Sequence, residues 1–505
     1  MSPKQSDILL TTINASYIHA SIGLRYLFAN LDELQARTSI LEFTSHLRPS
    51  DIAEKILQSG AKVIGFGVYI WNVEHTTKVI QLIKRIEPEI VIIIGGPEVS
   101  YEYEQQEIFH SSDYLIQGAA DTGFAALCRL ILSESSSDNQ LPPNAKVFHY
   151  QEPPLSEIKL PYQYYTNEDI TNRVIYAEAS RGCPFKCEFC LSALDKTSLP
   201  FDIDVFLTEM SHLYDRGARN FKFVDRTFNL KTETSLKILN FFLQRLDEQL
   251  FLHFEIIPDR LPETLKDTIA LFPANCLQFE IGVQSFNPQV QELISRKQNN
   301  QKTIENLSWL RNNSRAHLHA DLIFGLPGEN LDSFSRGFNQ LYQLGPHDIQ
   351  LGILKRLRGT PIIRHCKQFQ LIFEPSAPYS ILANDRIGFL LVQRISRFAR
   401  YWELIANSGH FKHSLPLLLD DNAFERFLIF SDWLYDFSGK THQISLRKLF
   451  DYLYYGFINC FHSHEQSSFA LNQSRYISAL LEDYQQAALK GLPEFYKTLP
   501  KSVEK

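Results

Sequence analysis

The sequence predicts an α/β protein in three parts: a doubly wound parallel sheet, a partial (β/α)6 barrel and a mainly helical C-terminal domain. Short runs rich in Ile and Val alternate with helical patterns, and this alternation occurs on both sides of a stretch rich in Pro and Ser. Beyond residue 373 strand-like runs are scarce, and apolar and aromatic residues recur at helical spacing. We therefore expect domains at 1–136, 173–372 and 373–505, with a linker at 137–172.

Strand-like runs and helical patterns alternate five times in the first domain. The strand-like runs are 7–13, 39–43, 62–68, 89–96 and 113–118. This alternation predicts a parallel sheet covered by helices on both faces. In such sheets ligands bind beyond the carboxyl ends of the strands. The segments GVYIWNVEH (67–75) and GGPEVS (95–100) follow the third and fourth strands and are candidate ligand-binding loops.

The second domain repeats the alternation with six strand-like runs. They are 173–180, 220–225, 252–257, 277–283, 318–324 and 348–354. Six βα units predict an open partial barrel rather than a closed eight-stranded one. In such barrels the chemistry lies at the C-terminal ends of the strands.

Charge, hydropathy and cysteine content indicate which partners and which cellular compartment to expect. The formal net charge is −7, which gives no general attraction to nucleic acid or anionic lipid, so we do not expect a nucleic-acid partner. There is no uninterrupted apolar run of about 18 residues, so no membrane span is predicted. The seven cysteines are an odd number with three clustered. That pattern favours a metal site in a reducing cytoplasm over a disulfide framework.

The clustered cysteines stand in the segment RGCPFKCEFC, as Cys183, Cys187 and Cys190. A structural zinc site needs four ligands, and no further His or Cys occurs before His212. The spacing fits one face of a cubane cluster, in which three thiolates bind three irons and the fourth iron accepts a small molecule. The motif directly follows the first barrel strand, which places it at the mouth of the barrel. Zinc is the alternative.

This C-x-x-x-C-x-x-C motif resembles that of the radical S-adenosylmethionine (radical SAM) superfamily. The aromatic residue before the last cysteine, Phe189, is also typical. The resemblance implies a 4Fe–4S cluster on the three cysteines, with SAM bound to the open iron. One electron from the reduced cluster then cleaves SAM to a 5′-deoxyadenosyl radical. A reductant such as flavodoxin or ferredoxin is implied as a partner.

Two later segments, at 279–298 and 319–329, resemble motifs of the same superfamily. By that resemblance Ser285 and Arg296 contact SAM. Phe189 lies in the motif itself and is a further candidate for the SAM site.

Three carboxylates are further candidates in the barrel. Glu255 and Glu280 stand on predicted strands, where they contact SAM or substrate or are simply carboxylates with partners inside the protein. The segment FVDRTFN (223–229) replaces a Gly-Gly-Glu segment, as in the cobalamin-associated branch of the superfamily. That makes Asp225 a candidate for a polar contact to SAM or substrate.

Residues 1–372 resemble the cobalamin-binding radical SAM enzymes, in which a flavodoxin-like domain precedes the barrel. The helical remainder resembles a subgroup whose C-terminal domain is uncharacterised. The resemblance implies cobalamin contacts from the two glycine-containing loops, at Trp71, Asn72, Gly95, Gly96, Pro97 and Glu98. Neither His19 nor His75 fits the D-x-H-x-x-G pattern that supplies a lower axial ligand to cobalt. A domain that has lost the cofactor is the alternative.

The expected function is radical SAM chemistry with cobalamin-dependent methyl transfer to an unactivated centre of an unknown substrate. The alternatives are a radical cyclase or rearrangement enzyme that transfers no methyl group, and a cluster-binding sensor without turnover. A second cluster is not expected, because the remaining cysteines are isolated in the sequence: Cys128, Cys276, Cys366 and Cys460.

Overall fold

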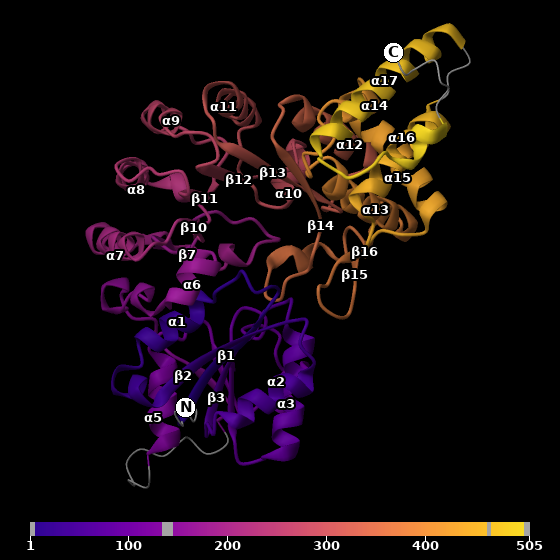
Figure 1. Ribbon diagram of the computed structural model, residues 1–505. Helices are drawn as coiled ribbons and strands as arrows, with labels where there is room; N and C mark the ends of the chain where they lie inside the picture. The colour runs from indigo at the N-terminus through magenta and orange to yellow at the C-terminus, as the bar shows by residue number, and fades with distance from the viewer. Residues whose placement is uncertain (1–5, 134–144, 462–465, 499–505) are drawn as a thin grey trace.

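The computed structural model describes residues 6–133, 145–461 and 466–498. Figure 1 shows three parts along the chain: the indigo N-terminal sheet, the magenta-to-orange partial barrel above it, and the yellow helices at the far end. The α/β class predicted from the sequence is confirmed, with two six-stranded parallel sheets. Within the described residues, none of the helices combines the length and the apolar character that crossing a membrane requires.

The N-terminal sheet has the strand order β2-β1-β3-β4-β5-β6, and neighbouring strands are parallel. This order is that of flavodoxin-like folds, with a switch point between β1 and β3. The sequence predicts five of the strands. The sixth, β6, lies inside the predicted linker, so the domain extends further than the expected boundary at 136. In chain order, the strands are Ile8–Asn14 (β1), Thr38–Thr44 (β2), Val63–Gly67 (β3), Val91–Gly95 (β4), Tyr114–Gln117 (β5) and Val147–His149 (β6).

Helices cover both faces of this sheet because its strands are apolar on both sides. One face packs under α1 (Ile22–Ala29) and α5 (Gly123–Leu132), and the other packs under α2 (Pro49–Gln58) and α3 (Val73–Ile86). A short helix, α4 (Glu107–Ser111), lies beside α3. The carboxyl ends of the strands are left uncovered by these helices.

The last part of the predicted linker, residues 162–172, packs with the barrel, whereas residues 137–144 lie outside the described residues. Tyr162 and Tyr165 are fully buried in the barrel core, and Tyr162 packs edge-on against Phe206. Helix α6 (Asn167–Asn172) begins with a capping box, in which Thr166 and Asp169 satisfy each other's backbone N–H groups. The segment is therefore packed structure rather than a connecting loop.

The barrel sheet has the order β14-β13-β12-β11-β10-β7, all parallel. In chain order, its strands are Ile175–Ala177 (β7), Asn220–Phe223 (β10), Phe251–Ile256 (β11), Leu277–Gln284 (β12), His317–Phe324 (β13) and Asp348–Ile353 (β14). The outer helices are Ile203–Asp215 (α7), Thr232–Leu243 (α8), Glu263–Ala270 (α9), Pro288–Leu293 (α10), Asn300–Asn313 (α11) and Leu331–Gln343 (α12). Six strands in an open sheet agree with the predicted partial barrel.

The two faces of the barrel sheet differ in chemistry. Along β12 the buried residues alternate, and Phe279 and Ile281 belong to the apolar core under the outer helices. The other face carries Glu280 and, on neighbouring strands, Glu255 and His319 at paired positions. A strand places successive side chains on opposite faces, so this polar row lines the inside of the barrel.

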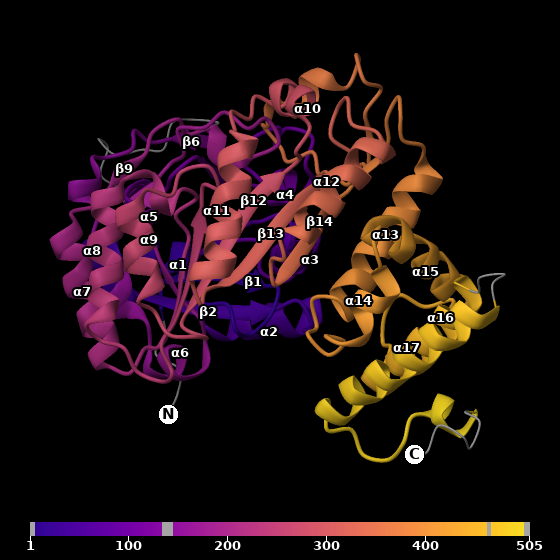
Figure 2. The same ribbon diagram turned by 90° about the horizontal axis from the view of Figure 1, so that it is seen from above.

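The C-terminal domain begins with a hairpin rather than a helix. Strands β15 (Ile372–Phe373) and β16 (Ile381–Ala383) pair antiparallel at the start of the predicted helical domain. The helices are Phe389–Ile405 (α13), Ser414–Leu419 (α14), Ala423–Ser438 (α15), Leu446–Cys460 (α16) and Gln466–Gln486 (α17). Figure 2 shows α13 to α15 beside α12 and β14. The Asn407 amide bonds both backbone groups of Ile349, which covers the edge of β14.

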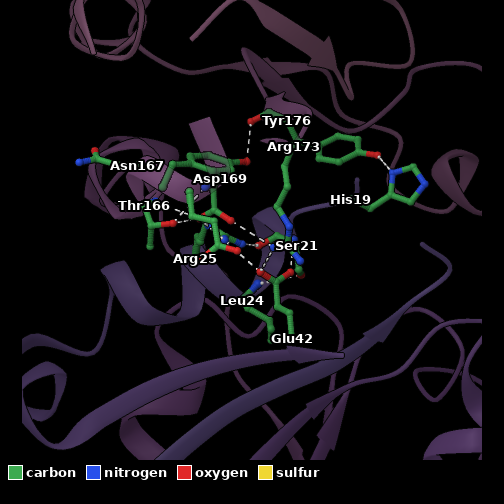
Figure 3. Close-up of polar contacts among 12 residues, drawn as sticks. His19, Ser21, Leu24, Arg25, Glu42, Thr166, Asn167, Asp169, Arg173 and Tyr176 are labelled. Atoms are coloured by element: carbon green, nitrogen blue, oxygen red, sulfur yellow. Dashed lines mark hydrogen bonds and ion pairs between the residues drawn. The ribbon is translucent and has the colours of Figure 1, made fainter. Parts of the chain in front are cut away.

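A buried ion-pair network joins the N-terminal sheet to the barrel (Figure 3). Arg25 lies 3.0 Å from Glu42 and 2.8 Å from Asp169, and Arg173 lies 2.8 Å from Glu42 and 3.1 Å from Asp169. All four side chains are less than 10% exposed, at 4% to 8%. Arg25 and Glu42 come from the first domain, whereas Asp169 and Arg173 precede β7. The network therefore fixes how the two domains face each other.

Candidate functional site

Two cavities lie at the carboxyl ends of the two sheets. The larger, of about 490 Å³, is lined by the ends of β3, β4 and β5 and by the chain that follows β7; we call it the interdomain cavity. The smaller, of about 230 Å³, is lined by Cys183, Cys187 and Cys190 and by the ends of β11 to β13; we call it the cysteine cavity. Both positions are where parallel α/β folds bind ligands.

The cysteine loop is held by backbone hydrogen bonds to distant segments. The Cys183 N–H donates to the Asp195 carbonyl at 3.0 Å. Within the loop, Glu188 exchanges backbone hydrogen bonds with Ile294 and Ile362, each at 3.0 Å. The three cysteines thus face the cavity from a loop whose position is set by two other parts of the barrel.

The Glu188 side chain adds a second anchor to this loop. It is 2% exposed, and its carboxylate accepts from the Ser295 hydroxyl at 2.5 Å. It also contacts His365 at 2.8 Å and the Arg364 guanidinium. A buried carboxylate is stable only with such partners. Nothing in the local sequence marks Glu188 for this role, because its partners lie more than 100 residues away along the chain.

The chemistry of the three thiols fits an iron–sulfur cluster. Burial raises the pKa of Cys183 and of Cys187, so iron binding must displace protons. Arg296 Nη1 lies 3.6 Å from Cys187 Sγ and favours its thiolate. In the described part of the chain, no three His, Cys, Asp or Glu side chains converge as a single metal ion requires. The three cysteines of a 4Fe–4S cluster each bind a different iron, so their sulfur atoms do not have to converge on a single metal position.

Four of the six predicted SAM residues line the cysteine cavity: Phe189, Glu255, Glu280 and Arg296. Arg296 is oriented by Gln298 at 2.9 Å and by the Gly282 carbonyl. Burial by itself would raise the pKa of Glu280, but the hydrogen bond from His253 and the charge of Lys222 lower it to about 2. Glu280 is therefore a permanent anion in the cavity wall.

The other two predicted SAM residues, Asp225 and Ser285, do not line this cavity, and both have hydrogen-bond partners within the protein. Asp225 is 4% exposed and accepts from the Ala179 N–H at 3.0 Å and the Ser180 hydroxyl at 2.6 Å. The Ser285 hydroxyl donates to Glu329 at 2.9 Å. The polar atoms of both side chains form hydrogen bonds within the protein. These bonds hold the backbone beside the cavity in place.

Two residues that the sequence analysis missed do line the cavity, Gln284 and Asp321. A bulge between Gly282 and Gln284 gives Gln284 a φ of +69°, a left-handed backbone in a non-glycine residue. Gln284 Oε1 and Asp321 Oδ1 are buried without a hydrogen-bond partner in the described structure. His319 lies 3.5 Å from Asp321 Oδ1, an ion-pair distance without hydrogen-bond geometry. Gln284 Oε1 can accept a hydrogen bond from a ligand, and Asp321 Oδ1 can do so beside its ion pair with His319.

Glycines form the floor of the interdomain cavity. Gly95 and Gly96 line it together with Pro97, as predicted for the loop after β4. Gly96 has a φ of +114°, and a Cβ there would meet the Val68 carbonyl oxygen at 2.5 Å. A Cβ on Gly95 would touch only the Ile116 carbonyl, at 3.5 Å. The Gly95 side of the loop is thus open toward the cavity, and a flat cofactor can approach its backbone.

Three predicted cobalamin contacts, Trp71, Asn72 and Glu98, do not line this cavity. Trp71 is 53% exposed, stacks on Tyr69 and donates to the Ile13 carbonyl. Asn72 is buried, with its amide bonded to the Tyr69 N–H and the Ile13 carbonyl. From the segment 67–75, Gly67 and Tyr69 are the residues that line the cavity.

Glu98 is a contact between domains. It is 4% exposed and accepts from Arg358 at 2.9 Å and from the Tyr379 hydroxyl at 2.5 Å. Arg358 follows β14, so the loop after β4 is tied to the far end of the barrel. Both contacts are made by Glu98 Oε1, which orients the carboxylate toward Arg358 and Tyr379.

Arg226 is the residue that lines both cavities. Its Nη1 donates to Glu255 at 2.6 Å, on the cysteine-cavity side. On the interdomain side, Arg181 is bound to Asp121 at 2.8 Å and to Glu178 at 3.0 Å. Burial raises the pKa of Glu178 in spite of the Arg181 charge. The two cavities therefore meet at a guanidinium on the loop after β10.

Family models match each of the three parts. They are a B12 binding domain at residues 8–128, the radical SAM superfamily at 178–339 and a protein of unknown function, DUF4080, at 367–501.

Among curated proteins, the chain is 25% identical to "Uncharacterized methyltransferase PH0819" of Pyrococcus horikoshii, over 61% of this chain and 70% of that one. It is 24% identical to "Cobalamin-dependent radical SAM methyltransferase TokK" of Streptomyces tokunonensis, over 58% of this chain and 47% of that one. The chain thus spans less than half of the second relative.

A solved structure shares the fold across nearly the whole chain. It is that of the cobalamin-dependent S-adenosylmethionine radical enzyme OxsB with aqua-cobalamin bound. The TM-score is 0.62 at 14% identity, covering 95% of this chain and 80% of that one. At this identity the likeness establishes the architecture only.

The fold, the cysteine loop and the family matches define the class: this is a radical SAM protein with an N-terminal B12-binding domain. More particularly, it is a radical SAM enzyme in which a DUF4080 match follows the barrel and whose cofactors are a 4Fe–4S cluster, SAM and cobalamin. Among the described residues that line the interdomain cavity there is no histidine.

Proposed function

We propose that the protein transfers a methyl group to an unactivated centre of its substrate by cobalamin-dependent radical SAM chemistry. The observation that carries the proposal is the junction at Arg226. A substrate there has access to the cysteine cavity on one side and to the interdomain cavity on the other. Methyl transfer needs both cofactors at one substrate atom, and this junction supplies such a position.

The relatives point the same way. One matched protein is described as an uncharacterised methyltransferase and another as a cobalamin-dependent radical SAM methyltransferase. When bound, the cluster and SAM supply the radical that removes a hydrogen atom from the substrate, and cobalamin supplies the methyl group.

The chain's own residues have distinct roles in this proposal. Cys183, Cys187 and Cys190 hold the cluster, while Arg296 is placed to meet the SAM carboxylate. Gln284 Oε1 and Asp321 Oδ1 are acceptors without donors, which the ribose hydroxyls and the ammonium group of SAM can supply. Enclosing these groups in the cavity excludes water from the reacting centre.

The test is anaerobic reconstitution of the full chain with iron, sulfide and hydroxocobalamin. Iron, sulfide and corrinoid are then measured per chain, and 5′-deoxyadenosine and S-adenosylhomocysteine are measured after reduction with dithionite. Both nucleosides are expected, because SAM serves as radical source and as methyl donor to cobalt. A Cys187→Ala control should lose iron and 5′-deoxyadenosine but keep its corrinoid.

The outcomes separate the alternatives. 5′-Deoxyadenosine without S-adenosylhomocysteine contradicts methyl transfer and indicates a radical reaction of another kind. A protein that binds the cluster and forms neither nucleoside is a sensor rather than an enzyme.

A further inference from the structure

A group of cations surrounds the outer side of the cysteine loop. Lys186 lies within the loop, between the first two cysteines, and is exposed. Exposed Arg260 places its guanidinium 5.7 Å from the Phe185 ring centre. Arg364 contacts Glu188 with a side chain that is 60% exposed, and Lys297 is exposed at the rim of the cysteine cavity. We call Lys186, Arg260, Lys297 and Arg364 the cluster-face patch.

Three of these cations, Lys186, Arg260 and Lys297, form no ion pair within the described residues, whereas the loop carboxylate Glu188 is already bound by Arg364 and His365. The Asp259 carboxylate, next to Arg260, accepts from the Asn299 backbone N–H at 2.8 Å. A positive surface here stands out in a chain of net charge −7.

The same surface exposes an apolar side chain. Ile363, beside Arg364, is 47% exposed, although its neighbour Ile362 is fully buried and donates its backbone N–H to Glu188. An exposed apolar group with a charged surround is the composition of a transient protein interface. The loop is also thin at this point: Cys183 and Cys187 are each 8% exposed, and Pro184 and Lys186 between them are exposed.

We propose that the cluster-face patch is the docking surface for an acidic one-electron carrier protein that reduces the cluster. This inference rests on the proposed function, because it assumes a cluster on the three cysteines. In the step itself the carrier loses one electron and the cluster gains one, and no bond is made or broken. Opposite charges steer the encounter, and the thin loop keeps the tunnelling distance short.

The test compares two electron sources in the reconstituted holoenzyme. Reduced flavodoxin is the protein donor, and dithionite is the chemical donor that needs no docking. The test variant is Lys186→Glu with Arg260→Glu, since neither side chain lines the cysteine cavity. The matched control is Lys55→Glu with Lys440→Glu, two exposed lysines on α2 and after α15.

With flavodoxin at low salt, SAM cleavage by the test variant should fall by about tenfold or more, and the deficit should shrink as salt screens the charges. With dithionite the variant should match the wild type within about twofold, and the lysine control should match it with both donors. Equal flavodoxin-driven rates in the test variant and the wild type would overturn the docking surface. An equal loss with both donors would also overturn it, because the damage would then lie in the cluster.

The proposed function fails separately, if the wild type itself cleaves no SAM with dithionite. In that case flavodoxin binding is titrated directly. Weaker binding by the test variant than by the lysine control still supports the patch, and equal binding rejects it.

Discussion

At the scale of single residues, two acids on the barrel, Asp225 and Asp321, show what separates a candidate ligand contact from a structural group. Asp225 and Asp321 both follow apolar strand residues in the sequence. Asp225 is satisfied by Ala179 and Ser180, whereas Asp321 Oδ1 has no hydrogen-bond partner among the described residues. A hydrogen bond from a ligand would therefore stabilise binding at Asp321, whereas at Asp225 it would have to replace a bond that already exists.

Removing an acceptor at the cysteine cavity should weaken SAM binding. For Gln284→Ala and for Asp321→Ala we expect the SAM dissociation constant of the reconstituted protein to rise roughly fivefold to tenfold, the worth of one lost hydrogen bond. Calorimetric titration under anaerobic conditions measures it. Gln350→Ala is the matched control, because Gln350 pairs with Asp321 across β13 and β14 but does not line the cavity. Unchanged affinity in both test variants would refute the assignment.

Asp225 makes stability depend on pH. Burial raises its pKa from 3.8 to about 7. The native state therefore binds the proton more tightly than the unfolded chain, and stability falls as the pH rises from about 4 to about 7. The loss attributable to Asp225 is on the order of 4 kcal/mol.

Asp225→Asn should flatten this dependence, since the amide does not titrate. Urea unfolding across the same pH range measures the slope for both proteins. A wild-type slope retained in the variant would show that other groups carry it. At pH 4 the wild-type carboxyl is protonated and, like the amide, has one acceptor oxygen and one donor group, so the two proteins are expected to have similar stability at that pH.

At the scale of elements, strand ends and loops decide where ligands reach the backbone. The loop after β4 serves two purposes within four residues. Gly95 and Gly96 open the interdomain cavity, and Glu98 ties the loop to Arg358 and Tyr379. The glycine pair in the sequence indicates the first purpose. The second depends on a partner about 260 residues away along the chain.

Filling the cavity from Gly95 should remove corrinoid and leave the cluster. Gly95→Leu adds a side chain on the open side of the loop, where a Cβ meets only one atom at 3.5 Å. We expect corrinoid per chain to fall by about tenfold or more, since overlap of this kind costs typically 1–3 kcal/mol or more, with iron content unchanged. Gly352→Leu is the control, because its Cβ also meets a single carbonyl at 3.5 Å, outside both cavities. Equal corrinoid in the two variants would contradict this position for cobalamin.

Most strands of both sheets could be predicted, because buried parallel strands leave runs of Ile, Val and Phe in the sequence. Strand β6 could not be predicted, because it is three residues long and lies at a sheet edge after a Ser- and Pro-rich stretch. The hairpin at 372–383 could not be predicted for the same reason, because its strands of two and three residues are too short to show the alternation of apolar and polar residues typical of a strand.

At the scale of the whole molecule, the cavities exist only because the domains hold a fixed orientation. The interdomain cavity has walls from β3, β4 and β5 on one side and from Glu178, Arg181 and Arg226 on the other. The buried network of Arg25, Glu42, Asp169 and Arg173 secures this arrangement (Figure 3).

Breaking the network should destabilise the protein strongly. Glu42→Gln leaves two buried guanidinium groups with one carboxylate, and an uncompensated buried charge costs about 3–5 kcal/mol. The urea midpoint followed by circular dichroism is the measurement. Glu54→Gln, an exposed acid on α2, should shift stability by no more than about 0.5 kcal/mol. A Glu42 variant as stable as the Glu54 variant would show that the network does not hold the domains.

The sequence by itself determined the α/β class and the three-part order, because strand and helix periods are local patterns, and the three thiols within eight residues predicted the position of the cluster. Only the tertiary structure decided which polar side chains face a ligand. Glu98, Asn72, Asp225 and Ser285 turned out to be satisfied inside the protein, while Gln284 and Asp321 were left with free acceptors. The physical reason is that a hydrogen-bond partner lies close in space but far along the chain, so the folded backbone alone determines which polar atoms remain unpaired.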